Sequence, residues 1–233
     1  MRSLLIALAA AVLAIVGAVA GRVVINERRV RRSRYARGLI EHLADSTSVD
    51  ADTGAVRSVQ RADLLIDEDA LAEIWTPTHL ERLARTYWRF LTRATLGLIR
   101  VHYTEAERSV VLLFSPLRLL TFQAPEYEMD ATHGLVRWRI ARGLLVARRG
   151  RNGRGYLQIE VRREPSSDPS RGQLHVEVEV ANFYPSIASG LGLALYNATQ
   201  SRIHVIVTYG FLRSLARLDL AESRVGRFRE DAI

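Results

Sequence analysis

The chain contains six histidines, and two of them could support acid–base chemistry through their spacing or setting. Asp130 and His133 are three residues apart and could form a carboxylate–imidazole pair that moves a proton. They lie between two strand-like segments, where aspartate more often stabilises a turn. His204 falls in an apolar C-terminal segment, where it could be a buried base or a hydrogen-bonded core residue.

No catalytic motif accompanies these residues. The chain lacks cysteine and lysine, which excludes thiolate metal sites, cysteine nucleophiles and lysine-containing phosphate loops. It also contains no H-E-x-x-H, G-x-S-x-G or EF-hand pattern. We therefore expect no metal and no cofactor, assign no catalytic residue, and favour a binding role over an enzymatic one.

Residues 1–25 read as a transmembrane helix. Residues 4–21 carry no charge and are long enough to begin spanning a bilayer. A basic segment follows, and we expect its arginines to contact anionic lipid: Arg28, Arg29, Arg31, Arg32, Arg34 and Arg37. The positive-inside rule then predicts a single-pass protein of the cell membrane with its body in the cytoplasm. Export through a signal peptide cleaved near Ala20, or anchoring with the body outside, is the alternative, and a fully soluble protein is a third.

Charge argues against nucleic acid as a partner. The chain has a net charge of +8, but residues 1–37 contain eight arginines and one acidic residue. The rest of the chain is therefore close to neutral, whereas a nucleic-acid-binding domain carries its excess on a folded face. All 33 basic residues are arginine, which a GC-rich genome explains without phosphate recognition.

Helical periodicity marks several segments. We expect the basic residues 26–54 to form a juxtamembrane helix followed by a linker, and residues 67–75 to form a short helix. Thr76 and Pro77 suit the start of an amphipathic helix of about 18 residues. Residues 191–218 read as a long C-terminal helix, although the β-branched stretch 203–209 could be a strand, and residues 219–233 form a charged tail.

Between the two long helices, apolar residues recur at every second position. A weak strand is expected at 55–65, before the helices. Alternating or continuous apolar runs then predict about six antiparallel strands with one apolar and one polar face. These runs are 99–103, 110–114, 119–122, 136–140, 157–161 and 174–180. The polar face carries both Arg and Glu, so cross-strand ion pairs are expected there.

The order of these elements resembles the START/polyketide-cyclase-like superfamily, the helix-grip fold. The resemblance covers residues 55–217 of a domain expected at 55–218. It implies an α+β domain whose antiparallel sheet wraps a long C-terminal helix and encloses an apolar cavity. It rests on element order and not on a motif, so it transfers no residue roles.

The leading hypothesis is a membrane-tethered domain that binds or transfers an apolar, lipid-like ligand. Its partners would be membrane lipids and an apolar small molecule. The residues expected to line the cavity are Trp138, Tyr156, Tyr196, His204 and Phe211. A non-catalytic interaction protein with a partner still to be identified, and a cyclase or hydrolase that uses Asp130, His133 or His204, are the two alternatives.

Overall fold

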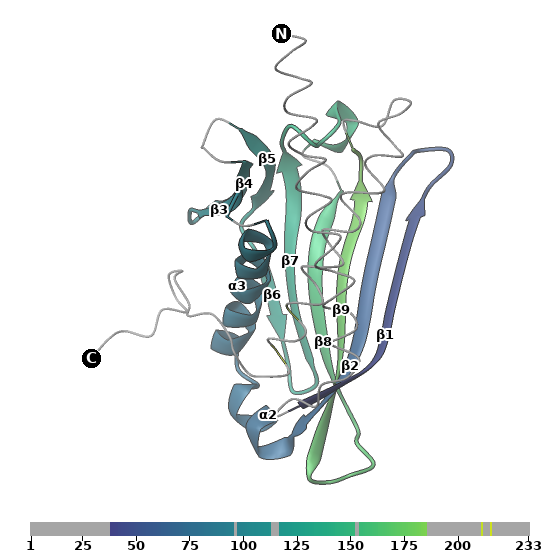
Figure 1. Cartoon of the computed structure of the whole chain (residues 1–233), viewed down its shortest axis with the longest axis vertical. Coiled ribbons are helices and arrows are strands. Elements are labelled where there is room, and N and C mark those ends of the chain that lie inside the picture. The colour runs from purple at the N-terminus through teal and green to yellow at the C-terminus, as the bar shows by residue number, and fades with distance from the viewer. Residues whose placement is uncertain are drawn as a thin grey trace, which may run out of the picture.

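The computed structural model describes residues 38–95, 97–112, 117–151 and 154–185, together with Phe211 and Leu215. In this part of the chain, two α-helices and a short 3₁₀ helix accompany nine strands (Figure 1). The helices are α2 (Glu68–Ile74), α3 (Pro77–Ala94) and η1 (Arg148–Gly150). The strands are β1 (Gly38–Val49), β2 (Val56–Asp67), β3 (Ile99–Tyr103), β4 (Glu107–Leu112), β5 (Arg118–Gln123), β6 (Glu126–Met129), β7 (His133–Arg142), β8 (Tyr156–Glu164) and β9 (Arg171–Phe183).

The strands form one antiparallel sheet in the order β1-β2-β9-β8-β7-β5-β4-β3. β6 also pairs with β7, so that β5 and β6 occupy successive parts of the same edge of β7. Pro125 lies between β5 and β6, where it interrupts the pairing because it has no N–H to donate. The architecture is the predicted α+β arrangement with a large antiparallel sheet.

α3 covers one face of the sheet beside β6 and β7, with α2 below it (Figure 1). Its start is set as the sequence predicts, because Thr76 Oγ1 accepts a hydrogen bond from the His79 backbone N–H at 3.3 Å and Pro77 occupies the first turn. Its apolar stripe is buried against the sheet: Leu80, Leu83, Ala84, Tyr87 and Trp88. We call the sheet face under α3 the inner face.

The opposite, outer face carries the predicted cross-strand ion pairs. Arg61 and Glu177 are register partners on β2 and β9, and Arg61 Nε lies 2.5 Å from Glu177 Oε2. Arg57 Nε lies 2.7 Å from Glu179 Oε1. The hydrogen bond and the charge of Glu177 raise the pKa of Arg61 above its ordinary value. The outer face is thus polar and charged along its middle strands.

The prediction of a helix and linker up to residue 54 is wrong over residues 38–49. These residues form the edge strand β1, which pairs with β2 from end to end except at a register shift between Glu41 and Ala44. A turn at residues 50–55 joins the two strands, in which the Asp50 N–H donates to the Ala55 carbonyl and Gly54 adopts φ +65°. The sequence does not indicate this strand, because most of its side chains are polar. Backbone hydrogen bonds to β2 hold it in place, so it needs few apolar residues.

The other predicted elements correspond to observed ones where the structure describes them. β2, α2, α3 and six later strands were expected, whereas the four-residue β6 was not. The predicted C-terminal helix lies outside the described residues apart from Phe211 and Leu215, and both of these are helical and buried. Residues 1–37 and 219–233 also lie outside them.

Candidate functional site

The inner face is apolar over the neighbouring strands β7, β8 and β9. Leu157, Ile159 and Val161 of β8 are at most 5% exposed, and their register partners on β7 and β9 continue the same apolar rows. The strand period of two produces this surface, since the alternate residues of each strand point to the outer face. Burial of these rows against α3 forms the main core.

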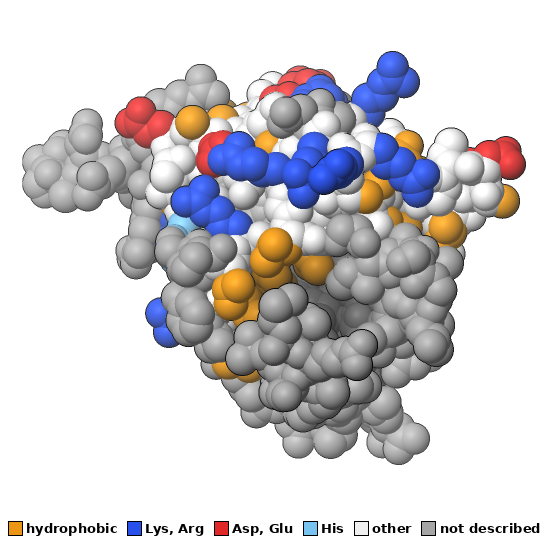
Figure 2. Space-filling view, turned by 90° about the horizontal axis from the view of Figure 1, so that it is seen from above, with side chains coloured by type: hydrophobic (Ala, Val, Ile, Leu, Met, Phe, Trp, Pro, Cys, Tyr) orange, Lys and Arg blue, Asp and Glu red, His pale blue; other side chains and the backbone are white. Residues whose placement is uncertain are grey.

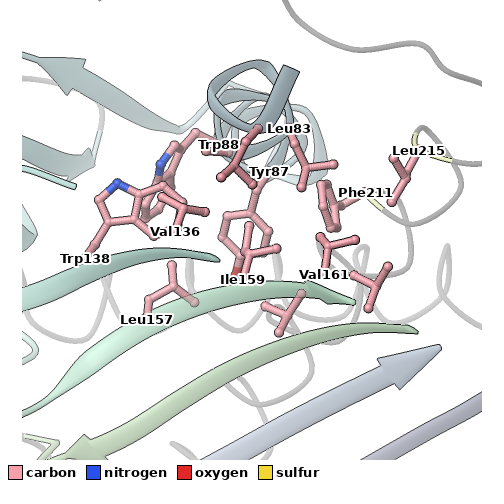
Figure 3. Close-up of a cluster of buried hydrophobic side chains, with 14 of the residues drawn as sticks. Leu83, Tyr87, Trp88, Val136, Trp138, Leu157, Ile159, Val161, Phe211 and Leu215 are labelled. Atoms are coloured by element: carbon pink, nitrogen blue, oxygen red, sulfur yellow. The ribbon is translucent and has the colours of Figure 1, made fainter. Parts of the chain in front are cut away.

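An aromatic cluster joins α3 to the sheet (Figure 3). The Trp88 ring on α3 lies with its centroid 5.1 Å from that of Trp138 on β7 and 5.4 Å from that of Phe122 on β5. Tyr87 contacts Trp88 edge to face at 5.3 Å and reaches Phe211 at 6.0 Å. Edge-to-face packing of this kind adds about 0.5–1.5 kcal/mol per pair beyond area burial.

Two polar atoms in this cluster have no hydrogen-bond partner. The indole Nε1 atoms of Trp88 and Trp138 are both buried, and neither donates to an acceptor in the described structure. Figure 3 shows the two indole nitrogens at the same end of the cluster. An unsatisfied buried donor costs about 1–3 kcal/mol. Such donors call for an acceptor that the described side chains do not supply.

A second polar group interrupts the inner face on β2. Gln60 is fully buried, and its Nε2 donates to Ser58 Oγ at 3.0 Å, while its Oε1 has no donor in the described structure. Ser58 Oγ lies 2.9 Å from Thr47 Oγ1 on β1. The inner face therefore has unpaired donors near β7 and an unpaired acceptor on β2, separated by the apolar rows of β8 and β9.

One charged side chain of α3 and one of β4 are also buried. Glu81 and Arg108 are each 3% exposed. Burial lowers the pKa of Arg108 below its ordinary value, while Tyr127, Tyr103 and Glu81 oppose that shift. The guanidinium of Arg108 donates to the Thr104 and Glu107 carbonyls, so its charge is held by the β3–β4 turn. We interpret this group as structural.

The residues predicted to line a cavity have different outcomes. Trp138 and Phe211 are buried in the core that α3 covers. Tyr156 lies on the outer face, where its hydroxyl donates to Glu179 Oε2 at 3.0 Å and its pKa is raised by burial and by that hydrogen bond. Tyr156 therefore takes no part in an inner-face site. Tyr196 and His204 lie outside the described residues.

The side chains of Asp130 and His133, considered above as a possible acid–base pair, bond to other groups. Asp130 Oδ1 accepts from the backbone N–H groups of Thr132 and His133, each at 2.8 Å, which lowers its pKa. The His133 ring instead lies 3.2 Å from Glu160 Oε1 on the outer face. Asp130 is thus a turn residue, as the alternative interpretation held. No group of three or more metal-ligating side chains occurs among the described residues.

The arginines expected to contact lipid, residues 28–37, and the apolar segment 1–25 lie outside the described residues. None of the helices that the structure describes is long and apolar enough to span a membrane. The membrane location thus stays a prediction.

Sequence reasoning did not select Trp88 or Gln60 as site residues. Trp88 falls on the apolar stripe of α3, where a tryptophan is indistinguishable from ordinary core. Gln60 could have been selected from the sequence, because it shares the alternating positions of the apolar residues Val56, Ala62 and Leu64 of its strand, which face the core. A glutamine in the buried phase of a strand marks a polar group that needs an internal partner.

No protein-family model and no curated protein matches the sequence. Solved structures do show similarity. Human StAR-related lipid transfer protein 5 is 11% identical, with a TM-score of 0.37 over 89% of this chain and 98% of the other. CalU16 from Micromonospora echinospora is 14% identical, with a TM-score of 0.27 over 86% and 84%. A conserved protein from Geobacillus kaustophilus is 10% identical, with a TM-score of 0.28 over 67% and 96%.

StAR-related lipid transfer proteins are thus among the similar structures. Their TM-scores with this chain are all below 0.5. The α+β architecture follows from the strand order and the helix positions described above. Membership of the START superfamily stays a prediction from element order.

Proposed function

We propose that this protein binds a lipid-like ligand, with an apolar body and at least one oxygen acceptor, between α3 and the inner face of its sheet. The observation that carries the proposal is the pair of buried indole N–H groups of Trp88 and Trp138, which have no acceptor among the described residues. A carbonyl, ether or hydroxyl oxygen of the ligand would accept from them. Without such an acceptor, the fold bears the full desolvation cost of both donors.

The composition of the inner face supports an apolar ligand body. The rows of β8 and β9 between the indole groups and Gln60 contain only aliphatic side chains, such as Ile159 and Val178. Apolar walls with a few convergent polar atoms are typical of small-molecule sites. Gln60 Oε1 could accept from a hydroxyl at the far end of such a ligand.

The apolar N-terminal segment of the sequence supports a role at a membrane. A ligand of this kind is poorly soluble in water, so a domain that takes it up gains from being held at the bilayer. We include single-pass tethering with the domain in the cytoplasm in the proposal, on the basis of residues 4–21 and the arginines that follow them. Among the described residues, Asp130 stabilises a turn and His133 pairs on the outer face, so these two do not form an acid–base site, and His204 lies outside the described part of the chain.

Native mass spectrometry of the full chain, released from membranes in mild detergent, tests the proposal. We expect an adduct of lipid mass that organic extraction recovers. The substitutions Trp88→Phe and Trp138→Phe remove the indole N–H donors and keep an aromatic ring at each position. Each change should reduce ligand retention about fivefold, the effect of a hydrogen bond worth about 1 kcal/mol.

Trp75→Phe is the matched control, because the Trp75 indole already donates to the Asp130 carbonyl at 2.9 Å. It should leave ligand retention unchanged. Two results would refute the proposal: a chain that is ligand-free in every preparation, or equal ligand retention in all three variants. Either would indicate that ordered water satisfies the indole N–H groups or that side chains fill the space beside them. Recurrent capture of one protein partner without a small molecule would instead favour an interaction protein.

A further inference from the structure

The connection between β7 and β8, residues 143–155, is strongly basic. It contains no acidic residue and carries four exposed arginines: Arg148, Arg149, Arg151 and Arg154. A fifth exposed arginine, Arg118 at the start of β5, adjoins it, since the Arg118 carbonyl accepts from the Leu144 N–H at 3.0 Å. We call this surface the arginine end.

Most of these cations lack the carboxylate partners that other arginines have. On the outer face, Arg57 and Arg139 each lie within 2.7 Å of a glutamate oxygen. Among the described residues, Arg148, Arg151 and Arg154 form no such pair, whereas Arg149 lies over the ring of Tyr184 at 4.9 Å. The three guanidinium groups are therefore available for an external anion.

Leu144 lies in the same connection and is 57% exposed, the larger value of the two exposed large hydrophobic residues in the described chain. Its position is fixed by the backbone. The Leu145 N–H donates to the Leu119 carbonyl at 3.1 Å, and the Ala147 N–H donates to the Tyr184 carbonyl at 2.8 Å. The leucine is thus held outward by bonds to neighbouring segments on both sides.

Figure 2 looks onto this end of the molecule, the upper end in Figure 1. Arginine side chains form a band across it, with hydrophobic side chains beside the band and acidic side chains mostly at the margins. The acidic residues of this end include Asp50 and Asp52 in the β1–β2 turn, and Glu107, whose Oε1 lies 2.8 Å from Arg142. They leave the arginine end with a net positive charge.

We propose that the arginine end docks onto an anionic lipid surface, with Arg148, Arg151 and Arg154 at the phosphates and Leu144 in the interfacial layer. Unpaired guanidinium groups would suit any polyphosphate. A rigidly exposed leucine gains only where an apolar layer lies beneath the phosphates, which favours a bilayer over nucleic acid. The proposal does not depend on the ligand of the inner face, but it would orient the domain against the membrane.

The absence of cysteine from the chain provides a clean probe. The full chain with Leu144→Cys, labelled with an environment-sensitive fluorophore, is reconstituted into vesicles of phosphatidylcholine alone or with phosphatidylglycerol. We expect a blue shift only with phosphatidylglycerol, reversed by high salt because screening weakens the contact. Ser167→Cys, on the exposed β8–β9 turn at the opposite end, should show no shift.

Two matched double variants in the Leu144→Cys background test the arginines. Arg148→Gln with Arg151→Gln should lower the ratio of docked to undocked probe about fivefold for each arginine, as expected for about 1 kcal/mol per charge. Arg162→Gln with Arg171→Gln removes the same charge elsewhere and should leave the ratio unchanged.

Three outcomes would overturn the proposal. The first is an equal probe response with and without phosphatidylglycerol, or none in either. The second is the same response at residue 167 as at residue 144. The third is a response to duplex nucleic acid but not to anionic vesicles, which would identify nucleic acid as the partner of this surface.

Discussion

The indole ring of Trp88 meets that of Trp138 edge to face, with ring centroids 5.1 Å apart and planes at 75°. One residue belongs to α3 and the other to β7, so this contact fixes the helix on the sheet. Both rings also bury an N–H group that has no acceptor in the part of the chain that the structure describes. The same pair thus stabilises the fold through its apolar surface and leaves hydrogen-bonding capacity unused inside it.

The three tryptophans allow that unused capacity to be observed directly. In protein stripped of ligand, the indole protons of Trp88 and Trp138 should resonate upfield of the hydrogen-bonded Trp75 proton in an NMR spectrum. Adding the extracted ligand should move the first two signals downfield and leave Trp75 unchanged. Three signals with similar shifts that do not respond would argue that both buried donors already have acceptors. The tryptophan-to-phenylalanine variants assign each signal.

Phe211→Ala should destabilise the domain by about 3–5 kcal/mol, because a fully buried aromatic side chain leaves a cavity. Urea unfolding followed by tryptophan fluorescence measures the change. Leu144→Ala serves as the control and should alter stability by less than about 0.5 kcal/mol, since that side chain is mostly exposed. A loss below about 1 kcal/mol for Phe211→Ala would mean that Phe211 is not part of the core.

Gly143→Ala should destabilise the connection between β7 and β8. Gly143 has φ +148°, and an added Cβ would lie 2.2 Å from the Leu119 carbonyl oxygen. Strain at such a position costs more than about 1 kcal/mol. Gly134→Ala is the matched control, because its Cβ would meet Leu80 at an ordinary 3.6 Å. Equal thermal unfolding temperatures for the two variants would contradict this expectation.

Asp130 should contribute to acid sensitivity. Hydrogen bonds from the backbone N–H groups of Thr132 and His133 hold its folded-state pKa below the ordinary 3.8. A depressed carboxyl pKa contributes stability above the unfolded-state value, and that contribution is lost as the pH falls through the folded-state value. Asp130→Asn keeps an acceptor in the turn and should flatten the decrease in melting temperature below pH about 4. An unchanged pH profile would contradict this.

Thr76→Ala should cost about 1 kcal/mol, because it removes the side-chain acceptor at the start of α3. Thr76→Ser retains the hydroxyl and should recover most of the loss. Chemical unfolding of the three proteins provides the comparison. If serine and alanine are equivalent at this position, the cap does not stabilise the helix.

Local patterns predicted most of the individual elements. The threonine–proline start and helical stripe of α3 were readable because capping and periodicity depend on residues a few positions apart. Strands β7, β8 and β9 were readable because their apolar residues alternate. β1 was missed because its polar residues gain stability from pairing with β2, and that pairing is not visible in β1 alone.

The candidate site depended on information that no single segment contains. Tyr156 was expected inside and lies outside, because its phase on β8 is opposite to that of Leu157. Gln60 and Trp88 gained importance only when burial showed that their polar atoms lack partners. The sequence by itself determined the positions of α2 and α3, the two-faced strands and the basic, apolar composition of residues 1–37. Only the tertiary structure decided which polar atoms are buried without partners and which leucine faces outward among arginines, because both depend on contacts between segments far apart in the chain.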